Sequence, residues 1–149
     1  MKSRKFRVGL IGAGGIAQNC HIPGWKNLPE AEIVGIADVS EAAVRKAAEL
    51  AGGTQTFSDY RDLLKLDLDA VDICTPNMVH TPAALAALNA GLHVLCEKPL
   101  AVSTADVRAM GTLADKKKLK LMTAQHQRFT QGGLAAISGT WDACIDVSG

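Results

Sequence analysis

Five residues near the N-terminus have the types and spacing of a phosphate-binding turn. They lie within a G-x-G-x-x-A pattern over residues 12–17 and are Gly12, Gly14, Gly15, Ile16 and Ala17. The apolar segment 6–11 predicts a strand directly before the pattern, and a helix is predicted over 16–28. A first glycine permits the tight turn, and a second lets the backbone approach a pyrophosphate at the helix N-terminus. A glycine-rich turn that binds nothing is the alternative.

An acidic residue follows the second predicted strand. Asp38 comes after the apolar segment 32–37 and 24 residues after Gly14 (38 − 14). A carboxylate at this place in a dinucleotide-binding fold accepts hydrogen bonds from the adenosine ribose. The carboxylate would repel the 2′-phosphate of NADP. The next arginine, Arg45, lies inside a predicted helix and does not follow Asp38 closely enough to accommodate that phosphate. The sequence therefore favours NAD and makes NADP the less expected cofactor. Capping of the following helix is the alternative role of Asp38, and the two roles are compatible.

Two further groups of polar residues each follow a buried strand. They are Thr75, Pro76, Asn77 and His80 after the strand over 70–74, and Glu97, Lys98 and Pro99 after the strand over 93–96. Ligands in open α/β sheets bind outside the carboxyl ends of the strands, so both groups are expected to line one crevice with the glycine turn.

The elements that must position these residues alternate along the chain. Besides the segments above, strands are predicted over 55–57 and 119–124. Helices are predicted over 16–28 with a break at Pro23-Gly24, over 41–50 after Ser40, from Ser58 to 64, from Thr81-Pro82 to Gly91, and from Ser103 with Asp106 to about 117. This alternation predicts an α/β fold, a doubly wound parallel sheet of the Rossmann type.

The composition excludes several other classes of protein. The chain has 149 residues, which is the length of one domain, and it is 48% hydrophobic and 21% charged, which argues against disorder. A net charge of +1 indicates no broad positively charged surface for binding nucleic acid. The Lys116–Lys118 run is expected to be a solvated helix end. Four scattered cysteines predict no metal site, and no apolar stretch is long enough for a membrane span. No signal peptide is recognised, so a reducing cytoplasmic location is expected.

The motifs together resemble the Gfo/Idh/MocA family of oxidoreductases, named for glucose–fructose oxidoreductase, inositol dehydrogenase and a rhizopine-catabolism protein. The resemblance rests on the glycine turn, His21-Ile22-Pro23, Asp38, Thr75-Pro76-Asn77 with His80, and Glu97-Lys98-Pro99, and it extends from about residue 5 to about residue 130. It implies an N-terminal NAD-binding domain. Members of the family oxidise or reduce sugars, inositols and related polyols with NAD or NADP.

The resemblance also implies roles for single residues. Thr75, Pro76 and Asn77 would line the path from the adenosine to the nicotinamide. Glu97 and Lys98 would lie beside the nicotinamide, with Lys98 as the catalytic residue that faces the substrate carbon, and a cis peptide is expected before Pro99. His80 is expected either to contact the cofactor or to begin a helix. Arg128 is expected to contact cofactor or substrate, or to form a salt bridge at the crossover to a second domain.

The last part of the chain departs from the family pattern. We expect a dinucleotide-binding domain over 1–130 and a tail unlike the family over 131–149, with the second α/β substrate domain and its Asp-x-x-x-His element absent. Truncation, a naturally short protein and a frameshift are the three explanations. With codons chosen to suit, residues 135–141 read out of frame give Gly-Asp-Leu-Gly-Asp-Val, which is similar to the Gly-x-Leu-Gly-x-Val segment with which the family enters that domain.

The missing domain leaves two functions open. The first is the nucleotide-binding domain of an oxidoreductase that transfers hydride to or from a sugar or polyol, with this chain inactive by itself. The second is a stand-alone nucleotide-binding or sensor module without catalysis. An apolar edge uncovered by the missing domain would favour a homo-oligomer.

Overall fold

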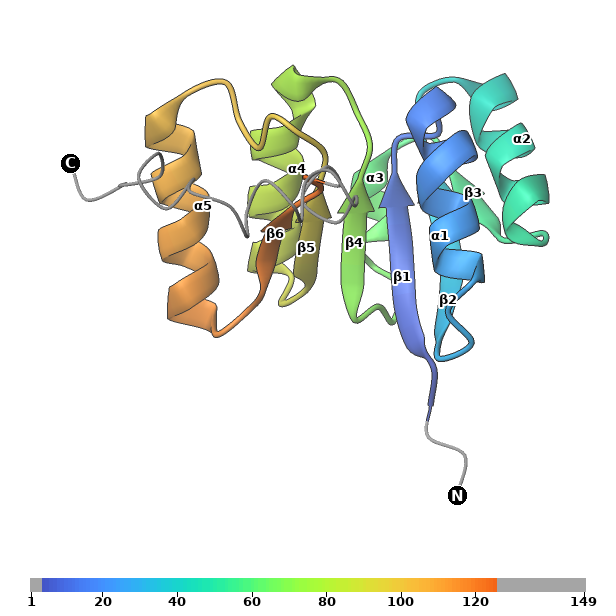
Figure 1. The fold of residues 1–149 in the computed structure, drawn as a ribbon, viewed down its shortest axis with the longest axis horizontal. Helices are drawn as coiled ribbons and strands as arrows, with labels where there is room; N and C mark the ends of the chain where they lie inside the picture. Colours follow the sequence, from blue (N-terminus) through green and yellow to red (C-terminus); the bar gives the residue numbers. More distant parts are fainter. Residues whose placement is uncertain (1–3, 126–149) are drawn as a thin grey trace, which may run out of the picture.

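A six-stranded parallel sheet forms the centre of the computed structural model, which describes residues 4–125 (Figure 1). The strands are β1 (Phe6–Ile11), β2 (Ala31–Ala37), β3 (Gln55–Phe57), β4 (Ala70–Ile73), β5 (His93–Cys96) and β6 (Leu121–Thr123). Their order is β3-β2-β1-β4-β5-β6, and every neighbouring pair is parallel. The predicted doubly wound sheet is therefore confirmed. The direction of winding reverses between β1 and β4, where open α/β sheets bind ligands.

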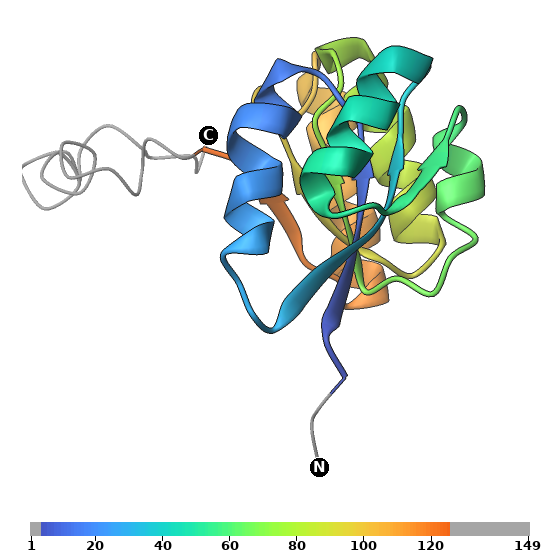
Figure 2. The ribbon, with the colours of Figure 1, turned by 90° about the vertical axis from the view of Figure 1, so that its right-hand side faces the viewer.

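Helices cover both faces of this sheet (Figure 2). They are η1 (Ala17–His21, a π-helix), α1 (Ile22–Lys26), α2 (Glu41–Ala51), α3 (Tyr60–Leu63), α4 (Asn77–Asn89) and α5 (Thr104–Lys117). One core layer packs Val8, Leu10 and Ile36 under α1 and α2. The other packs aliphatic side chains such as Val71 and Leu88 under α3, α4 and α5. No helix in the described part of the chain is long and apolar enough to cross a membrane.

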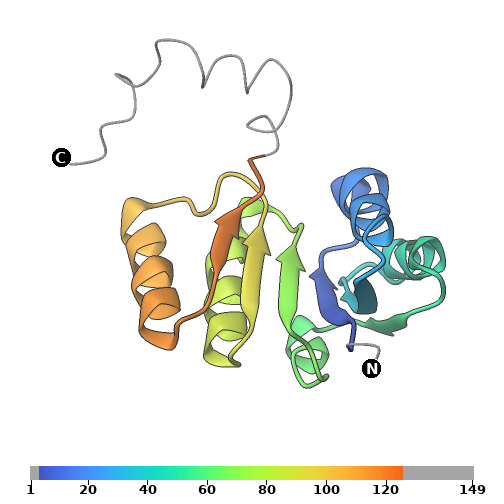
Figure 3. The same cartoon turned by 60° about the horizontal axis from the view of Figure 1, so that its bottom comes forward.

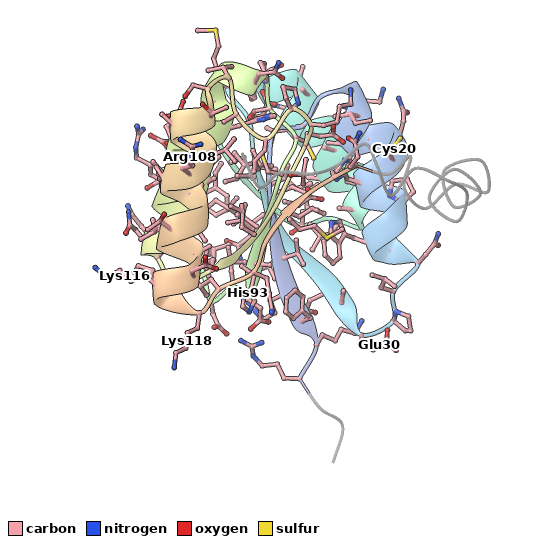
Figure 4. All side chains as sticks on the ribbon, turned by 60° about the vertical axis from the view of Figure 1, so that its left-hand side comes forward. Cys20, Glu30, His93, Arg108, Lys116 and Lys118 are labelled. Atoms are coloured by element: carbon pink, nitrogen blue, oxygen red, sulfur yellow. The ribbon has the colours of Figure 1, made fainter. Side chains whose placement is uncertain are left out.

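Several predicted helix ends are confirmed. The Ser40 side chain accepts a hydrogen bond from the backbone of Ala43, and Ser103 accepts one from Asp106, so both serines cap their helices. Lys116 and Lys118 extend from the C-terminal end of α5 away from the sheet (Figure 4), as expected of a solvated helix end.

The helix predicted to begin at Thr81-Pro82 begins earlier, so this prediction is wrong. Helix α4 starts at Asn77, directly after Pro76, and encloses Pro82. A proline inside a helix removes one backbone hydrogen bond to the residue four positions before it. That residue is Met78, which is 84% exposed, so water can satisfy its carbonyl group.

The break predicted at Pro23-Gly24 is also wrong. The helix after the glycine turn continues from η1 into α1, and the N–H of Ile22 donates to the carbonyl of Ala17, five residues before it. Pro23 has no N–H to give, and a π-turn directly before it accommodates this loss.

Two smaller differences from the sequence prediction concern the cap of α3 and the length of β6. Asp59, not Ser58, caps α3, because its carboxylate accepts a 2.8 Å hydrogen bond from the N–H of Arg61. The last described strand, Leu121–Thr123, is shorter than the predicted 119–124.

Candidate functional site

Two hollows flank the glycine turn at the carboxyl ends of the strands, which all point to the same side of the sheet (Figure 3). The first is a cleft of about 650 Å³, and its lining includes Gly12, Gly14, Asp38, Arg61, Thr75 and Pro76. The second is an apolar hollow of about 540 Å³, and its lining includes Ile16, Cys20, His21, Trp25, Glu97 and Ala124. The structure thus brings the predicted glycine turn, the acidic residue and the two polar groups to one edge of the sheet.

Gly12 and Gly14 are glycines for different reasons. Gly12 has a φ of +100°, and a Cβ there would lie 2.7 Å from the backbone carbon of Cys74, so the fold itself requires glycine. A Cβ on Gly14 would meet no atom within 4 Å. The bare backbone at Gly14 therefore serves no contact within the described chain and leaves room for a ligand.

Asp38 connects the end of β2 to the glycine turn. Its Oδ2 accepts a 2.7 Å hydrogen bond from the N–H of Ala13, and its Oδ1 accepts a 2.8 Å bond from the N–H of Ser40. The cap of α2 is Ser40, so Asp38 does not have the simple capping role. Its carboxylate instead lies on the wall of the cleft.

His80 holds the two polar loops together. Its Nε2 lies 2.9 Å from the carbonyl oxygen of Thr75, and its Nδ1 lies 2.8 Å from that of Pro99. The ring is 0% exposed. His80 lies in the first turns of α4 but does not begin it, and it presents no exposed atom to the cleft.

One buried hydroxyl in the cleft lacks a partner. The Oγ1 of Thr75 is the only buried side-chain N or O atom without a hydrogen bond among residues 4–125. Such groups are rare because no hydrogen bond compensates for the contacts with water that they lose on burial. A ligand in the cleft could supply the missing partner.

A buried charge network lies beneath the second hollow. Nδ1 of His21 lies 2.8 Å from Oδ2 of Asp72, and Nε2 lies 3.0 Å from Oε1 of Glu97. Trp25 also donates to Asp72, at 2.7 Å. No role was predicted for His21 or for Asp72 from the sequence. A charged residue inside the apolar strand 70–74 was the available signal.

Burial alone would lower the pKa of His21, but the hydrogen bonds and charges of Asp72 and Glu97 outweigh it and raise the pKa to about 9. The imidazole is therefore a cation at neutral pH.

Burial, with the nearby charges of Asp72 and Glu97, raises the pKa of Cys74 and raises that of Cys96 to about 12. Neither thiol is prepared to act as a nucleophile.

The remaining predicted site residues lie on the loops after β4 and β5. Asn77 is the exposed first residue of α4. Lys98 is exposed, its N–H donates to Oε2 of Glu97 at 3.0 Å, and its bond to Pro99 is cis as expected. Arg128 lies outside the described residues.

Arg61 was missed, because the contact of α3 with the cleft depends on the order of the strands. Its guanidinium pairs with Asp59 at 3.0 Å and lies 5.1 Å above the ring of Tyr60. The sequence offers no short-range signal for this placement.

Comparisons with known proteins agree with this geometry. The D-glucoside 3-dehydrogenase of Escherichia coli is 35% identical over 130 residues, which cover 87% of this chain and 37% of the relative. The WlbA dehydrogenase of Chromobacterium violaceum, solved with NADH and UDP-GlcNAcA, is 33% identical with a TM-score of 0.80 over 86% of this chain and 37% of that one. KijD10, a 3-ketoreductase of Actinomadura kijaniata solved with NADP and TDP-benzene, is 30% identical with a TM-score of 0.77 over 85% of this chain and 41% of that one.

The chain thus spans well under half the length of these relatives. The family model described as "Oxidoreductase family, NAD-binding Rossmann fold" matches residues 6–125, which is nearly all of the described chain. The chain belongs to the Gfo/Idh/MocA family of NAD(P)-dependent oxidoreductases and carries its nucleotide-binding domain.

Proposed function

We propose that this chain binds NAD in the cleft beside Gly14 and Asp38, as the nucleotide-binding part of an enzyme that oxidises or reduces a sugar or polyol. The observation that carries the proposal is the carboxylate of Asp38, which lies on the cleft wall and contacts the glycine turn through Ala13. A ribose diol placed there would donate hydrogen bonds to a carboxylate that already accepts two.

Two features of the cleft fit a dinucleotide. The backbone at Gly14 is bare, which suits the close approach of a pyrophosphate to the N-terminus of the helix that follows. The partnerless Oγ1 of Thr75 lies on the opposite side of the turn, after β4. We assign Gly12, Gly14, Gly15 and Ile16 to the pyrophosphate, and Thr75, Pro76 and Asn77 to the path toward the nicotinamide.

NAD is favoured over NADP by the charges around Asp38. A 2′-phosphate would meet the carboxylate of Asp38 directly. Arg61 is a cation on the same cleft, but it is already paired with Asp59. Relatives solved with NADH and with NADP both exist, so this preference is a property of these side chains and not of the family.

The reactive end is assigned to Glu97 and Lys98. A bound nicotinamide supplies the carbon that accepts or gives the hydride. Lys98 is exposed and directly follows Glu97, which lines the second hollow. Its ammonium can donate a hydrogen bond to the oxygen of a substrate and stabilise charge that develops there. We assign His80 to positioning and Arg128 to contact with cofactor or substrate.

The substrate is proposed from the relatives and not from this chain. One of the named relatives is a D-glucoside 3-dehydrogenase and another, the WlbA dehydrogenase, is solved with UDP-GlcNAcA, and this chain spans 37% of each of them. We propose that residues 1–130 form the nucleotide-binding domain, that 131–149 lie outside it, and that turnover requires a substrate domain. We also propose a reducing, cytoplasmic location, which the free thiols of Cys20, Cys74 and Cys96 favour. We further propose that the chain associates with itself through the apolar second hollow.

Titration of the chain with NADH, followed by the fluorescence of the cofactor, tests this function. Saturable binding, tighter for NADH than for NADPH, is expected. A panel of sugars and polyols with NAD is then assayed for reduction, and no turnover is expected from the chain alone. Absence of NADH binding would overturn the proposal, and turnover by this chain would overturn the need for a substrate domain.

A further inference from the structure

Three ionisable side chains are buried together where the helix after the glycine turn meets the ends of β4 and β5. Asp72 is 0% exposed, Glu97 is 7% exposed, and the side chain of His21 is 9% exposed. Charges removed from water are costly unless they are paired and hydrogen-bonded. The group must therefore be held in one arrangement by its own contacts.

The imidazole of His21 bridges the two carboxylates. Its Nδ1 lies 2.8 Å from Asp72 and its Nε2 lies 3.0 Å from Glu97, and carboxylates can only accept hydrogen bonds. Both ring nitrogens therefore donate, which requires the cationic form. The raised pKa of His21 agrees with this requirement.

The two carboxylates differ in how much they depend on His21. Asp72 has other donors, since the indole N–H of Trp25 lies 2.7 Å from it and the thiol of Cys74 lies 3.7 Å from it. Glu97 has only one other donor among the described residues, the backbone N–H of Lys98, which lies 3.0 Å from its Oε2. Loss of His21 would thus free Glu97 far more than Asp72.

We propose that His21 is a positioning residue that acts through Glu97 to fix Lys98 at the reactive end of the site. The chain of contacts runs from η1 through the imidazole to one oxygen of Glu97, and from the other oxygen to the amide of Lys98. Because η1 continues the helix that begins at the glycine turn, the same contacts hold the phosphate-binding end and the Lys98 end in a fixed relation. The inference rests on the proposed cofactor site.

Two substitutions of His21 separate this role from a merely structural one. In His21→Gln the amide nitrogen takes the place of Nε2, which keeps the donor to Glu97 and removes the donor to Asp72. In His21→Asn the amide nitrogen takes the place of Nδ1, which does the opposite. A role in neutralising Asp72 predicts that Asn is the better replacement, whereas positioning through Glu97 predicts that Gln is.

The first measurement is the 1H–15N resonance of the Lys98 amide at pH 7 in protein labelled with 15N-lysine, assigned with Lys98→Arg. We expect the resonance to move in His21→Asn and to return toward the wild-type position in His21→Gln. The second is NADH affinity, which should fall about tenfold in His21→Asn, as for loss of a charge-assisted hydrogen bond, and recover in large part in His21→Gln. His93→Asn, a histidine at the far end of β5, is the matched control and should change neither.

A double-mutant cycle covers the case in which His21→Asn folds poorly. Glu97→Gln should move the Lys98 resonance by itself, and His21→Leu, which removes the donor to Glu97, should then add little to it, because both changes act on one contact. Equal effects of Asn and Gln at position 21, the reverse order, or additive effects in the cycle would each overturn the inference. If the wild-type chain does not bind NADH, the proposed function fails, and the Lys98 resonance still decides the role of His21.

Discussion

The carboxylate of Asp38 accepts a 2.7 Å hydrogen bond from the backbone N–H of Ala13, and so joins the end of β2 to the glycine turn. This contact gives the turn a fixed position. In the proposed site the same carboxylate would face the adenosine ribose and favour NAD over NADP.

Removal of this charge should change the preference for the cofactor. We expect Asp38→Asn to raise the Kd for NADH about tenfold, because a charged acceptor is lost. The Kd for NADPH should stay the same or fall, since the repulsion of its 2′-phosphate is removed. Fluorescence titrations with the two cofactors measure the ratio. Asp62→Asn, an exposed residue of α3 that pairs with Lys65, is the control and should leave both constants unchanged.

Gly12 and Gly14 should respond to alanine in opposite ways. Gly12→Ala forces a Cβ to within 2.7 Å of the backbone at Cys74 and a φ of +100° on alanine, so it should lower the free energy of unfolding by about 2–4 kcal/mol. Gly14→Ala should leave the free energy of unfolding within about 1 kcal/mol of wild type and weaken NADH binding by at least about tenfold.

Urea denaturation and NADH titration on both variants separate these effects. Gly14→Ala that binds NADH as tightly as the wild type would show that the pyrophosphate does not approach the backbone there. Gly12→Ala of wild-type stability would contradict the close approach of β1 and the loop after β4.

The stability of the fold should decrease at alkaline pH because of His21. Its pKa is raised in the folded state from an ordinary value near 6.5 to about 9, so its stabilisation is fully present below pH 6.5 and is lost as the pH rises through 9. The loss should be on the order of 2–3 kcal/mol. Among the titratable groups that face the imidazole are Asp72 and Glu97, and Cys74 lies behind Asp72.

Urea denaturation at a series of pH values between 6 and 10 measures this dependence. In His21→Gln the decrease between pH 6.5 and about 8 should disappear, because no group titrates at position 21, whereas the loss above about pH 8.5 that follows from the raised pKa values of Cys74 and Cys96 should remain. A curve of the same slope in wild type and variant would assign the alkaline loss to other groups.

His80 should be more important for stability than its small polar ring suggests. His80→Phe leaves the carbonyl groups of Thr75 and Pro99 facing a ring that cannot donate, which should cost about 2–4 kcal/mol in the free energy of unfolding. His80→Gln keeps a donor to Thr75 and should recover part of that loss. His93→Phe, at a partly exposed position of β5, should cost less than about 1 kcal/mol. Equal losses for His80→Phe and His93→Phe would refute the connecting role of His80.

Local sequence determined much of the fold and the outline of the site. The strand and helix periodicities, Ser40 and Ser103 as caps, and the glycine turn were readable because each depends on residues close together in the chain. Asp38, Thr75 and Glu97 were predicted to share one crevice, because parallel strands bring their carboxyl ends to the same edge of the sheet. The structure places all three at that edge, but Asp38 and Thr75 line the first cleft and Glu97 lines the second hollow.

Only the tertiary structure decided the parts that depend on distant contacts. Helix α4 begins at Asn77 and passes through Pro82, although the local signal at Thr81-Pro82 predicted a start there. The packing of His80 between the two loops stabilises the earlier start, and this packing joins residues from two different βα units.

The network of His21, Asp72 and Glu97 is of the same kind. Its members are separated by 51 and 76 residues from His21 in the chain, and no spacing rule relates them. Arg61 likewise reaches the cleft only because β3 and α3 pack beside β2. The sequence by itself determined which segments form strands, helices and turns, whereas the sheet order decided which distant charges share a low-dielectric site, because such pairing energies exist only once the chain has folded.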